Sequence, residues 1–255
     1  SYTEAILQEK LPASVVIIGA GAIGVEFATI WNAYGSQVEL VEMLPHILPL
    51  EDDEVAAELE KNFKRRKINL HTGYRVLEVK RNPDGVEVII SNGTDEKVLK
   101  AEQALVAIGF RPNSENLGLE ALGVEKDARG FIQVDEHMAT NVPGIYAIGD
   151  VTGKLLLAHV ASAQAVVCAE SIAGMETHTL DYEMMPAAVY SHPQVASFGL
   201  SEQEAQKAGR EVKVGRFPFL PNGKALGLGE NVGFVKLVSD ASTNELLGAH
   251  LIGPD

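Results

Sequence analysis

The chain is 255 residues long, 46% of them hydrophobic, and carries a formal net charge of −14 at pH 7. This length allows one large domain or two smaller ones with their own cores. The acidic balance argues against nucleic acid and an anionic membrane surface as partners, and no apolar run approaches the roughly 20 residues of a membrane-spanning helix. The N-terminus lacks a secretory signal pattern, and the single cysteine, Cys168, excludes an internal disulfide. We therefore expect a reducing location, the cytoplasm or an equivalent organelle interior.

After a short lead-in, helical at most around Glu4–Glu9, the first unit is a strand, a glycine-rich turn and a helix. Val15–Ile18 is fully apolar, as is typical of a strand buried on both faces. It leads into the Gly-x-Gly-x-x-Gly segment Gly19–Gly24, and apolar residues then recur at helical spacing. A second strand, Gln37–Val41, ends at Glu42. This order predicts a dinucleotide-binding βαβ unit.

Each glycine of this turn has its own expected role. Gly19 allows a tight turn, Gly21 lets the backbone approach a pyrophosphate, and Gly24 lets the helix pack closely on the strand. The pyrophosphate would lie at the positive end of the helix. The alternative is a glycine turn that serves packing alone and binds no ligand.

Glu42 indicates which dinucleotide binds. A carboxylate at this position accepts hydrogen bonds from both ribose hydroxyls of NAD and repels the 2′-phosphate of NADP. No Lys or Arg lies between Gly35 and Glu51 to receive that phosphate. The sequence therefore favours NAD, with a solvated strand end as the alternative reading of Glu42.

The next segment predicts a second helix, a small antiparallel meander and a return strand. Asp52 and Asp53 can cap a helix on which Val55, Leu59 and Phe63 share one face. The basic residues of its last turn suit the helix dipole better than a phosphate site. Asn-Pro-Asp-Gly and Ser-Asn-Gly-Thr turns separate the strands that follow. The expected strands are Ile68–His71, Tyr74–Lys80, Val86–Ile90, Lys97–Lys100 and Ala104–Ile108.

The remaining chain predicts two further regions. After a polar connection over residues 112–129, we expect strands at Phe131–Val134 and Ile145–Ile148 and an Ala-rich helix over residues 156–173, with Cys168 as a small apolar residue inside it. From Asp181 on, the pattern is that of a separate α+β unit with one capped helix, Ser201–Ala208. Its expected strands are Ala187–Ser191, Ala196–Leu200, Val212–Phe217, Phe234–Val238 and Leu246–Ile252. The seven histidines show no H-x₃-H pairing, so no metal site is predicted.

Several motifs, in order and spacing, resemble the dihydrolipoamide dehydrogenases, which are flavin-dependent disulfide oxidoreductases. The matching segments are Gly19–Glu26, Gly109–Asn113, Arg129–Asp135, Ile145–Asp150, Leu156–His159, Tyr190–Pro193 and Gly248–Pro254. The resemblance covers essentially the whole chain. It implies an α/β fold: a Rossmann-like NAD-binding domain with an antiparallel meander over residues 1–128, part of an FAD domain over 129–180, and an incomplete α+β dimerisation domain over 181–255.

The resemblance also implies cofactor-binding residues. NAD would contact the glycine turn and the start of its helix, with Glu42 on the adenosine ribose and Glu26 near the nicotinamide. The NAD set is Gly19, Ala20, Gly21, Ala22, Ile23, Gly24, Val25, Glu26, Glu42, Val76 and Gly109. The FAD set is Asp150, Leu156, Leu157, Ala158 and His159. From the residues alone, Asp150 also reads as a turn or helix cap and His159 as a structural histidine.

Three parts of the family's reaction are missing from this sequence: a cysteine pair, a preceding FAD-binding glycine fingerprint and a C-terminal His–Glu base. We therefore expect no catalytic residue in the chain, no dithiol oxidation by it alone and no retained FAD. The resemblance implies that the full enzyme passes electrons from dihydrolipoamide through a disulfide and FAD to NAD⁺. It implies a homodimer and, as partners, lipoyl domains of 2-oxo acid dehydrogenase complexes. The alternatives are a piece of an NADPH-linked reductase resembling glutathione reductase, and a free-standing NAD-binding or dimerisation module.

Overall fold

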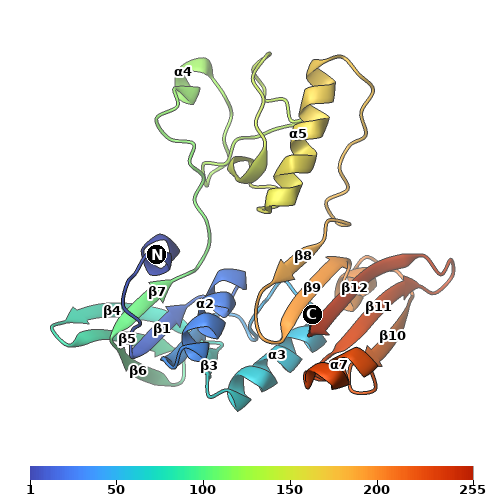
Figure 1. The fold of residues 1–255 in the computed structure, drawn as a ribbon. Helices are drawn as coiled ribbons and strands as arrows, with labels where there is room; N and C mark the ends of the chain where they lie inside the picture. The colour runs from blue at the N-terminus through green and yellow to red at the C-terminus, as the bar shows by residue number, and fades with distance from the viewer. Residues whose placement is uncertain (255) are drawn as a thin grey trace. The chain divides into compact units, whose positions relative to one another are not determined.

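The computed structural model describes residues 1–254, which form two compact units (Figure 1). One unit consists of Ser1–Ile108 together with Pro186–Asp255, and the other is Gly109–Met185. The first unit begins with a short helix, α1 Tyr2–Ile6. It contains all the sheets of the described residues, and it holds the glycine-rich turn.

A parallel sheet forms the centre of the first unit. In residues 1–254 its four strands follow the order β3-β2-β1-β7, and Val15 of β1 lies between Val38 of β2 and Gln103 of β7. The predicted return strand to the main sheet is therefore confirmed. The strands are β1 Ser14–Ile18, β2 Gln37–Glu42, β3 Asn69–Thr72 and β7 Gln103–Val106, and the connecting helices are α2 Ala22–Ala33 and α3 Asp53–Arg65.

Strand β1 is buried on both faces, which is why its sequence is apolar without alternation. Val15 and Ile17 pack into one core cluster with residues of α2 and α3. Val16 and Ile18 point to the other face and pack into a second cluster with the meander. The meander consists of β4 Arg75–Asn82, β5 Gly85–Ser91 and β6 Glu96–Ala101, paired antiparallel as the turn sequences predict.

The second unit is mainly irregular chain, with α4 Leu119–Leu122, the 3₁₀ turn η1 Gly149–Thr152 and α5 Ala158–Ile172. The predicted Ala-rich helix is confirmed, and Cys168 is buried in it. The predicted strands Phe131–Val134 and Ile145–Ile148 are wrong. In the described residues they make only the isolated bridges Lys126↔Ile132 and Ala139↔Tyr146. Carbonyl groups outside any strand accept from these backbone N–H groups instead. Ile132 N, for example, donates to the carbonyl oxygen of Val151 in η1 at 2.9 Å.

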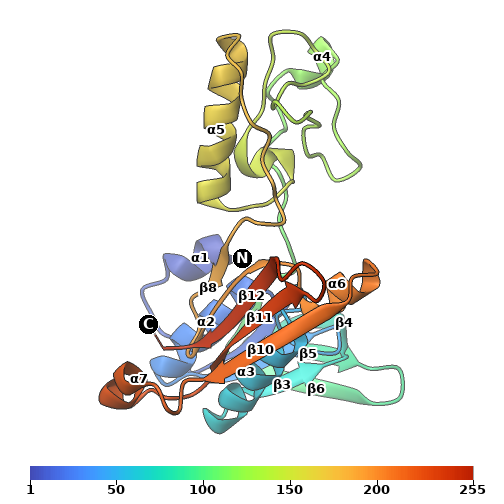
Figure 2. The same cartoon turned by 90° about the vertical axis from the view of Figure 1, so that its right-hand side faces the viewer.

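The C-terminal segment of the first unit folds as an antiparallel sheet (Figure 2). Its order is β10-β11-β12-β9-β8, and its strands are β8 Ala187–Val189, β9 Gln194–Gly199, β10 Val212–Pro218, β11 Phe234–Asp240 and β12 Leu246–Gly253. The predicted helix is α6 Glu202–Lys207, and Ser201 and Glu204 form the predicted capping box. A second helix, α7 Gly223–Leu228, was not predicted. Asn222 caps it through its side chain, which accepts from Ala225 N at 3.0 Å.

Candidate nucleotide-binding site

Two glycines of the fingerprint are required by the packing of the chain itself. Gly19 has a φ of +99°, and a Cβ built on it would lie 2.4 Å from the carbonyl oxygen of Ala107. A Cβ on Gly24 would lie 1.9 Å from the carbonyl oxygen of Gly19. These close backbone approaches bring α2 onto β1 and β1 beside the residues that follow β7. Any side chain at either position would force the backbone apart.

Gly21 differs from the other two. Its φ is −71°, which other residues adopt readily, and within residues 1–254 nothing lies within 4 Å of a Cβ built on it. Gly21 is the N-cap of α2, without a side-chain hydrogen bond or an acidic residue in the first turn of that helix among the described residues. The turn is thus an open cradle at the positive end of a helix, which suits a phosphate group.

Glu42 closes the other side of this cradle. Its side chain is largely buried, at 9% exposure, so the reading as a solvated strand end is wrong. One carboxylate oxygen accepts from Ala20 N at 2.8 Å and the other from Leu44 N at 2.9 Å. The carboxylate thereby joins the end of β2 to the glycine turn. Each oxygen keeps a further lone pair for a hydroxyl donor.

The other predicted NAD residues lie in different surroundings. Ala20 and Val25 are buried in the core, Val76 packs against the second core cluster, and Ala22 and Ile23 form the first turn of α2. Glu26 accepts a hydrogen bond from Tyr190 N at 2.9 Å, which ties α2 to the segment after β8. Gly109 belongs to the second unit.

The five predicted FAD residues come together in the second unit. Asp150 lies exposed in η1, and Leu157 is the N-cap of α5. That N-cap makes no side-chain hydrogen bond among the described residues. Ala158 and His159 begin the helix and are exposed, and Leu156 is half-buried. The N-terminus of α5, which is the positive end of the helix dipole, is thus formed by exposed residues.

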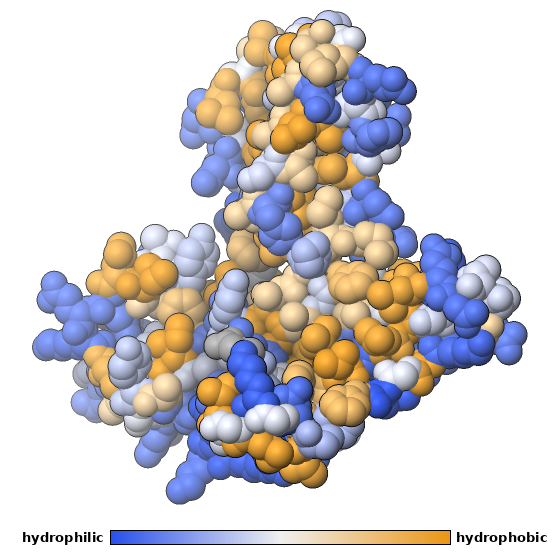
Figure 3. All heavy atoms as spheres, turned by 45° about the vertical axis from the view of Figure 1, so that its right-hand side comes forward, coloured by the Kyte–Doolittle hydropathy of each residue, from blue (hydrophilic) through white to orange (hydrophobic). Residues whose placement is uncertain are grey.

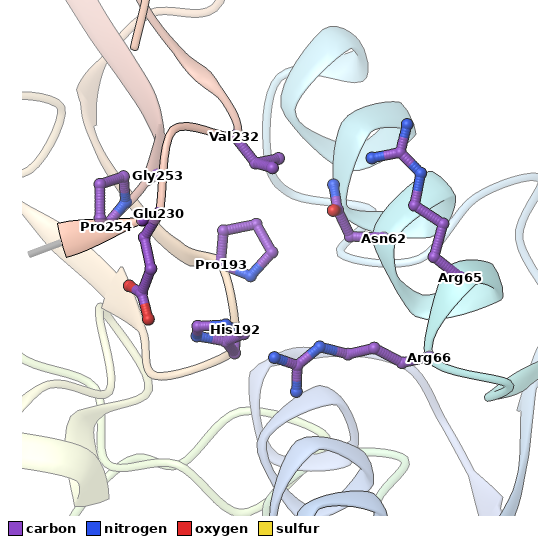
Figure 4. Close-up of a pocket in the computed structure, with 10 residues that line it drawn as sticks. Asn62, Arg65, Arg66, His192, Pro193, Glu230, Val232, Gly253 and Pro254 are labelled. Carbon is purple, nitrogen blue, oxygen red and sulfur yellow. The ribbon is translucent and has the colours of Figure 1, made fainter. Parts of the chain in front are cut away.

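A cavity of about 300 Å³ lies elsewhere in the first unit, between the end of α3 and the C-terminal sheet (Figure 4). Figure 4 shows the Arg66 side chain directed toward His192, with Glu230 on the far side. Its lining is Asn62, Arg65, Arg66, His192, Pro193, Gly229, Glu230, Val232, Gly253 and Pro254. None of the predicted site residues lines it.

Three side chains with buried polar atoms, Glu51, His250 and Lys236, were missed by the sequence analysis. Burial raises the pKa of Glu51, whose carboxyl group bonds the Ser197 hydroxyl and lies near His250. Within residues 1–254, Glu51 Oε2 and His250 Nδ1 are buried without a hydrogen-bond partner. Lys236 has 0% exposure and lies against Asp52. A lysine at an inward-facing position of an otherwise apolar strand could have indicated this buried ion pair from the sequence.

The described residues contain no group of three or more His, Cys, Asp or Glu side chains placed to hold a metal ion. No helix among residues 1–254 has the length and hydropathy needed to cross a membrane.

Comparison with known families decides the assignment. Residues 1–165 match the model of the pyridine nucleotide-disulphide oxidoreductases, and residues 185–255 match that of their dimerisation domain. The chain belongs to this oxidoreductase family. The resemblance found in the sequence and the predicted fold class are both confirmed.

Two relatives show how much of a longer protein the chain covers. It is 52% identical over 254 residues to dihydrolipoyl dehydrogenase of Mycobacterium leprae, covering 99% of the chain and 54% of that protein. The enzyme of Corynebacterium glutamicum is 50% identical over 258 residues, covering 99% and 55%. The chain thus spans about half the length of these relatives.

Solved structures of the family agree with this fold. LpdA of Mycobacterium tuberculosis superposes with a TM-score of 0.88 at 30% identity, covering 97% of this chain and 53% of that one. The HOCl-induced flavoprotein disulfide reductase RclA of Escherichia coli superposes with a TM-score of 0.89 at 25% identity, covering 98% and 57%. The structures that this fold resembles therefore include a flavoprotein disulfide reductase.

Proposed function

We propose that the chain is the NAD-binding and dimerisation portion of an enzyme of the dihydrolipoyl dehydrogenase type. The observation that carries this proposal is the open cradle at Gly21, bounded by the buried carboxylate of Glu42. Packing explains Gly19 and Gly24, whereas the space over Gly21 is open at the N-terminus of α2, where a phosphate group would fit. The identity to dihydrolipoyl dehydrogenases over nearly the whole chain supports the same assignment.

NAD suits this cradle better than NADP. The pyrophosphate would accept hydrogen bonds from N–H groups of the turn, and the adenosine ribose would donate to Glu42. A 2′-phosphate would instead meet a carboxylate that is already held by Ala20 N and Leu44 N and cannot turn away without losing both bonds. This arrangement supports NAD as the cofactor of residues 1–128, which we assign as the NAD-binding domain.

We assign residues 129–180 to an FAD domain. Asp150 and Leu156–His159 would contact the flavin, and the α5 N-terminus, which lacks a side-chain cap among the described residues, fits a group that becomes negative on reduction. FAD, when bound, supplies the two-electron chemistry between a dithiol and the nicotinamide. These residues are a small part of a flavin site, so we propose that the chain alone does not retain FAD.

The remaining residues, 181–255, would join two copies into a homodimer, as the dimerisation-domain match supports. Figure 3 turns the side of the first unit that carries the C-terminal sheet forward, and apolar side chains lie there among hydrophilic ones. Exposed large apolar residues of the segment are Met184, Tyr190, Phe217, Leu220, Leu226, Leu228, Leu237 and Leu246. For the whole enzyme we propose a reducing compartment and lipoyl domains of 2-oxo acid dehydrogenase complexes as partners.

A titration with reduced nucleotides tests the proposal. Trp31 is the chain's only tryptophan and lies on α2, so energy transfer from it to a bound nicotinamide reports binding. NADH should bind at least about tenfold more tightly than NADPH, a difference of about 1.4 kcal/mol. Glu42→Gln should lower the affinity for NADH about tenfold and reduce the difference between the NADH and NADPH affinities, because a charged hydrogen-bond acceptor is lost. Glu39→Gln, on the same strand but bonded to His71, is the matched control and should bind like the parent chain.

Three outcomes would contradict the proposal. Tighter binding of NADPH would favour an NADPH-linked reductase, and absence of binding by both nucleotides would refute the dinucleotide site. The chain has one cysteine, so dihydrolipoamide with NAD⁺ should yield no NADH. Sustained NADH formation would refute the assignment of the dithiol step to residues outside this sequence.

A further inference from the structure

Lys236 is a buried cation enclosed by carboxylates from distant parts of the chain. The side chain lies on β11 with 0% exposure. Its Nζ donates to Asp52 Oδ2 at 2.8 Å and to Glu54 Oε1 at 2.7 Å. Glu202 Oε2 is 3.0 Å away. An ammonium group has three donors, and these three carboxylates accept from all of them.

The electrostatics of this cluster favour the charged forms. Burial by itself lowers the pKa of the Lys236 ammonium, but its bonds to Asp52, Glu54 and Glu202 outweigh burial and raise that pKa above its ordinary value. Arg216, the more exposed second cation, donates to Glu54 through Nε at 2.8 Å. That bond is the largest of the effects that bring the pKa of Glu54 down to about 2. Lys236 and Glu54 are therefore both charged at neutral pH.

Asp52 connects this cluster to the nucleotide cradle. It is the N-cap of α3, where Oδ1 accepts from Glu54 N at 3.0 Å while Oδ2 binds Lys236. Residues 43–51 are the whole connection from Glu42 to Asp52, so Asp52 fixes one end of the segment that begins at Glu42.

The same segment is held to the glycine turn in its middle. Leu48 N donates to the carbonyl oxygen of Ala20 at 2.8 Å, and Ile47 N donates to Glu60 Oε1 at 3.2 Å. Both Ile47 and Leu48 are buried in the core. Ala20 also donates to Glu42 through its own N–H. A displacement of the start of α3 would therefore be transmitted to Ala20 and Glu42 along short, buried connections.

We propose that Lys236, supplied by the dimerisation domain, is a positioning residue for the adenosine side of the NAD site, which it orders by holding Asp52. This inference rests on the proposed function, because it assumes that Glu42 and the glycine turn bind NAD. It makes nucleotide affinity depend on a residue of a different domain that contacts no nucleotide. It also predicts that loss of Lys236 weakens binding of the adenosine half of the ligand only, so that ligands with and without the nicotinamide lose the same factor in affinity.

The test compares full-length variants of this chain for NADH and ADP-ribose binding. Lys236→Met removes the charge, and the double variant Lys236→Met with Asp52→Asn also removes the buried anion while keeping an N-cap residue. Lys236→Arg is the conservative rescue. Arg216→Met is the matched control, because Arg216 donates hydrogen bonds to Glu54 and Glu202 but acts on Asp52 only through longer-range electrostatics. Circular dichroism establishes that each variant is folded at the assay temperature.

We expect the double variant to bind NADH and ADP-ribose about tenfold more weakly than the parent chain, by the same factor for both ligands. The affinities of Lys236→Arg should lie closer to those of the parent chain. Arg216→Met should change neither affinity by more than about twofold. Unchanged affinities in the folded double variant, or an equal loss in Arg216→Met, would overturn the positioning role while leaving the NAD site intact. If the parent chain binds neither ligand, the proposed function fails first and this inference fails with it.

Discussion

Replacing Gly24 by alanine should lower the stability of the fold, whereas replacing Gly21 by alanine should lower the affinity for NADH. The Cβ of Gly24→Ala would start 1.9 Å from the Gly19 carbonyl oxygen, and Cβ atoms essentially never come within 3.0 Å of a heavy atom outside their own and adjacent residues. Helix α2 and the turn must therefore separate by about 1 Å, and no side-chain rotation relieves a clash with backbone. Overpacking of this kind costs about 3 kcal/mol, which lowers Tm by roughly 6 to 12 °C in a chain of this size.

Gly21→Ala should behave in the opposite way. Its φ of −71° suits alanine, and the space around it is clear within the described residues. The reduced freedom of the unfolded chain should leave stability unchanged or raise it by at most about 1 kcal/mol. NADH affinity should nonetheless fall at least about tenfold, since the methyl group occupies the cradle.

Thermal unfolding and the Trp31 energy-transfer titration measure the two effects on the same samples. The reasoning would be refuted if Gly21→Ala lost as much Tm as Gly24→Ala. It would also be refuted if Gly21→Ala bound NADH like the parent chain, because the open space would then have no connection with a ligand.

Two further predictions concern charge and capping. Because burial raises the pKa of Glu51, its protonated form stabilises the fold below the ordinary value of 4.5, and this contribution is lost as pH rises through the raised folded pKa. Urea unfolding should therefore show the free energy of unfolding of Glu51→Gln rising relative to that of the parent chain as pH increases from about 4 through the raised folded pKa. A gain independent of pH would contradict this. Ser201→Ala removes the acceptor of the Glu204 N–H, and it should lower the free energy of unfolding by about 1 kcal/mol and Tm by roughly 2 to 4 °C. Ser201→Thr is the control and should retain most of the stability.

Local patterns were enough to predict the glycine turn and the acid beside it. An apolar strand, three spaced glycines and an acid at the next strand end lie within about thirty residues, and each follows from near-neighbour sterics. The roles expected for Gly19 and Gly24 agree with the backbone approaches that the structure shows. The burial of Glu42 by Ala20 N and Leu44 N required coordinates, because it depends on how the turn folds back over the strand end.

Long-range features were beyond sequence patterns. Asp52 and Lys236 are 184 residues apart, and nothing in either local sequence specifies the other as its partner. Helix α7 was missed because its two glycines weaken helical propensity. The caps at Asn222 and Gly229 define its ends instead. The strands expected at Phe131–Val134 and Ile145–Ile148 failed for a related reason, since a strand exists only where a partner strand is available.

The strand order of the parallel sheet bears on how the protein emerges from the ribosome. β1 lies between β2, which follows it closely in sequence, and β7, which begins at Gln103. Until that segment is synthesised, one edge of the apolar run Val15–Ile18 has no native partner. At typical elongation rates the wait between β1 and β7 is roughly 4 to 18 s. Unpaired apolar edges promote association, so the nascent chain passes through a period in which chaperone binding would compete with aggregation at this strand.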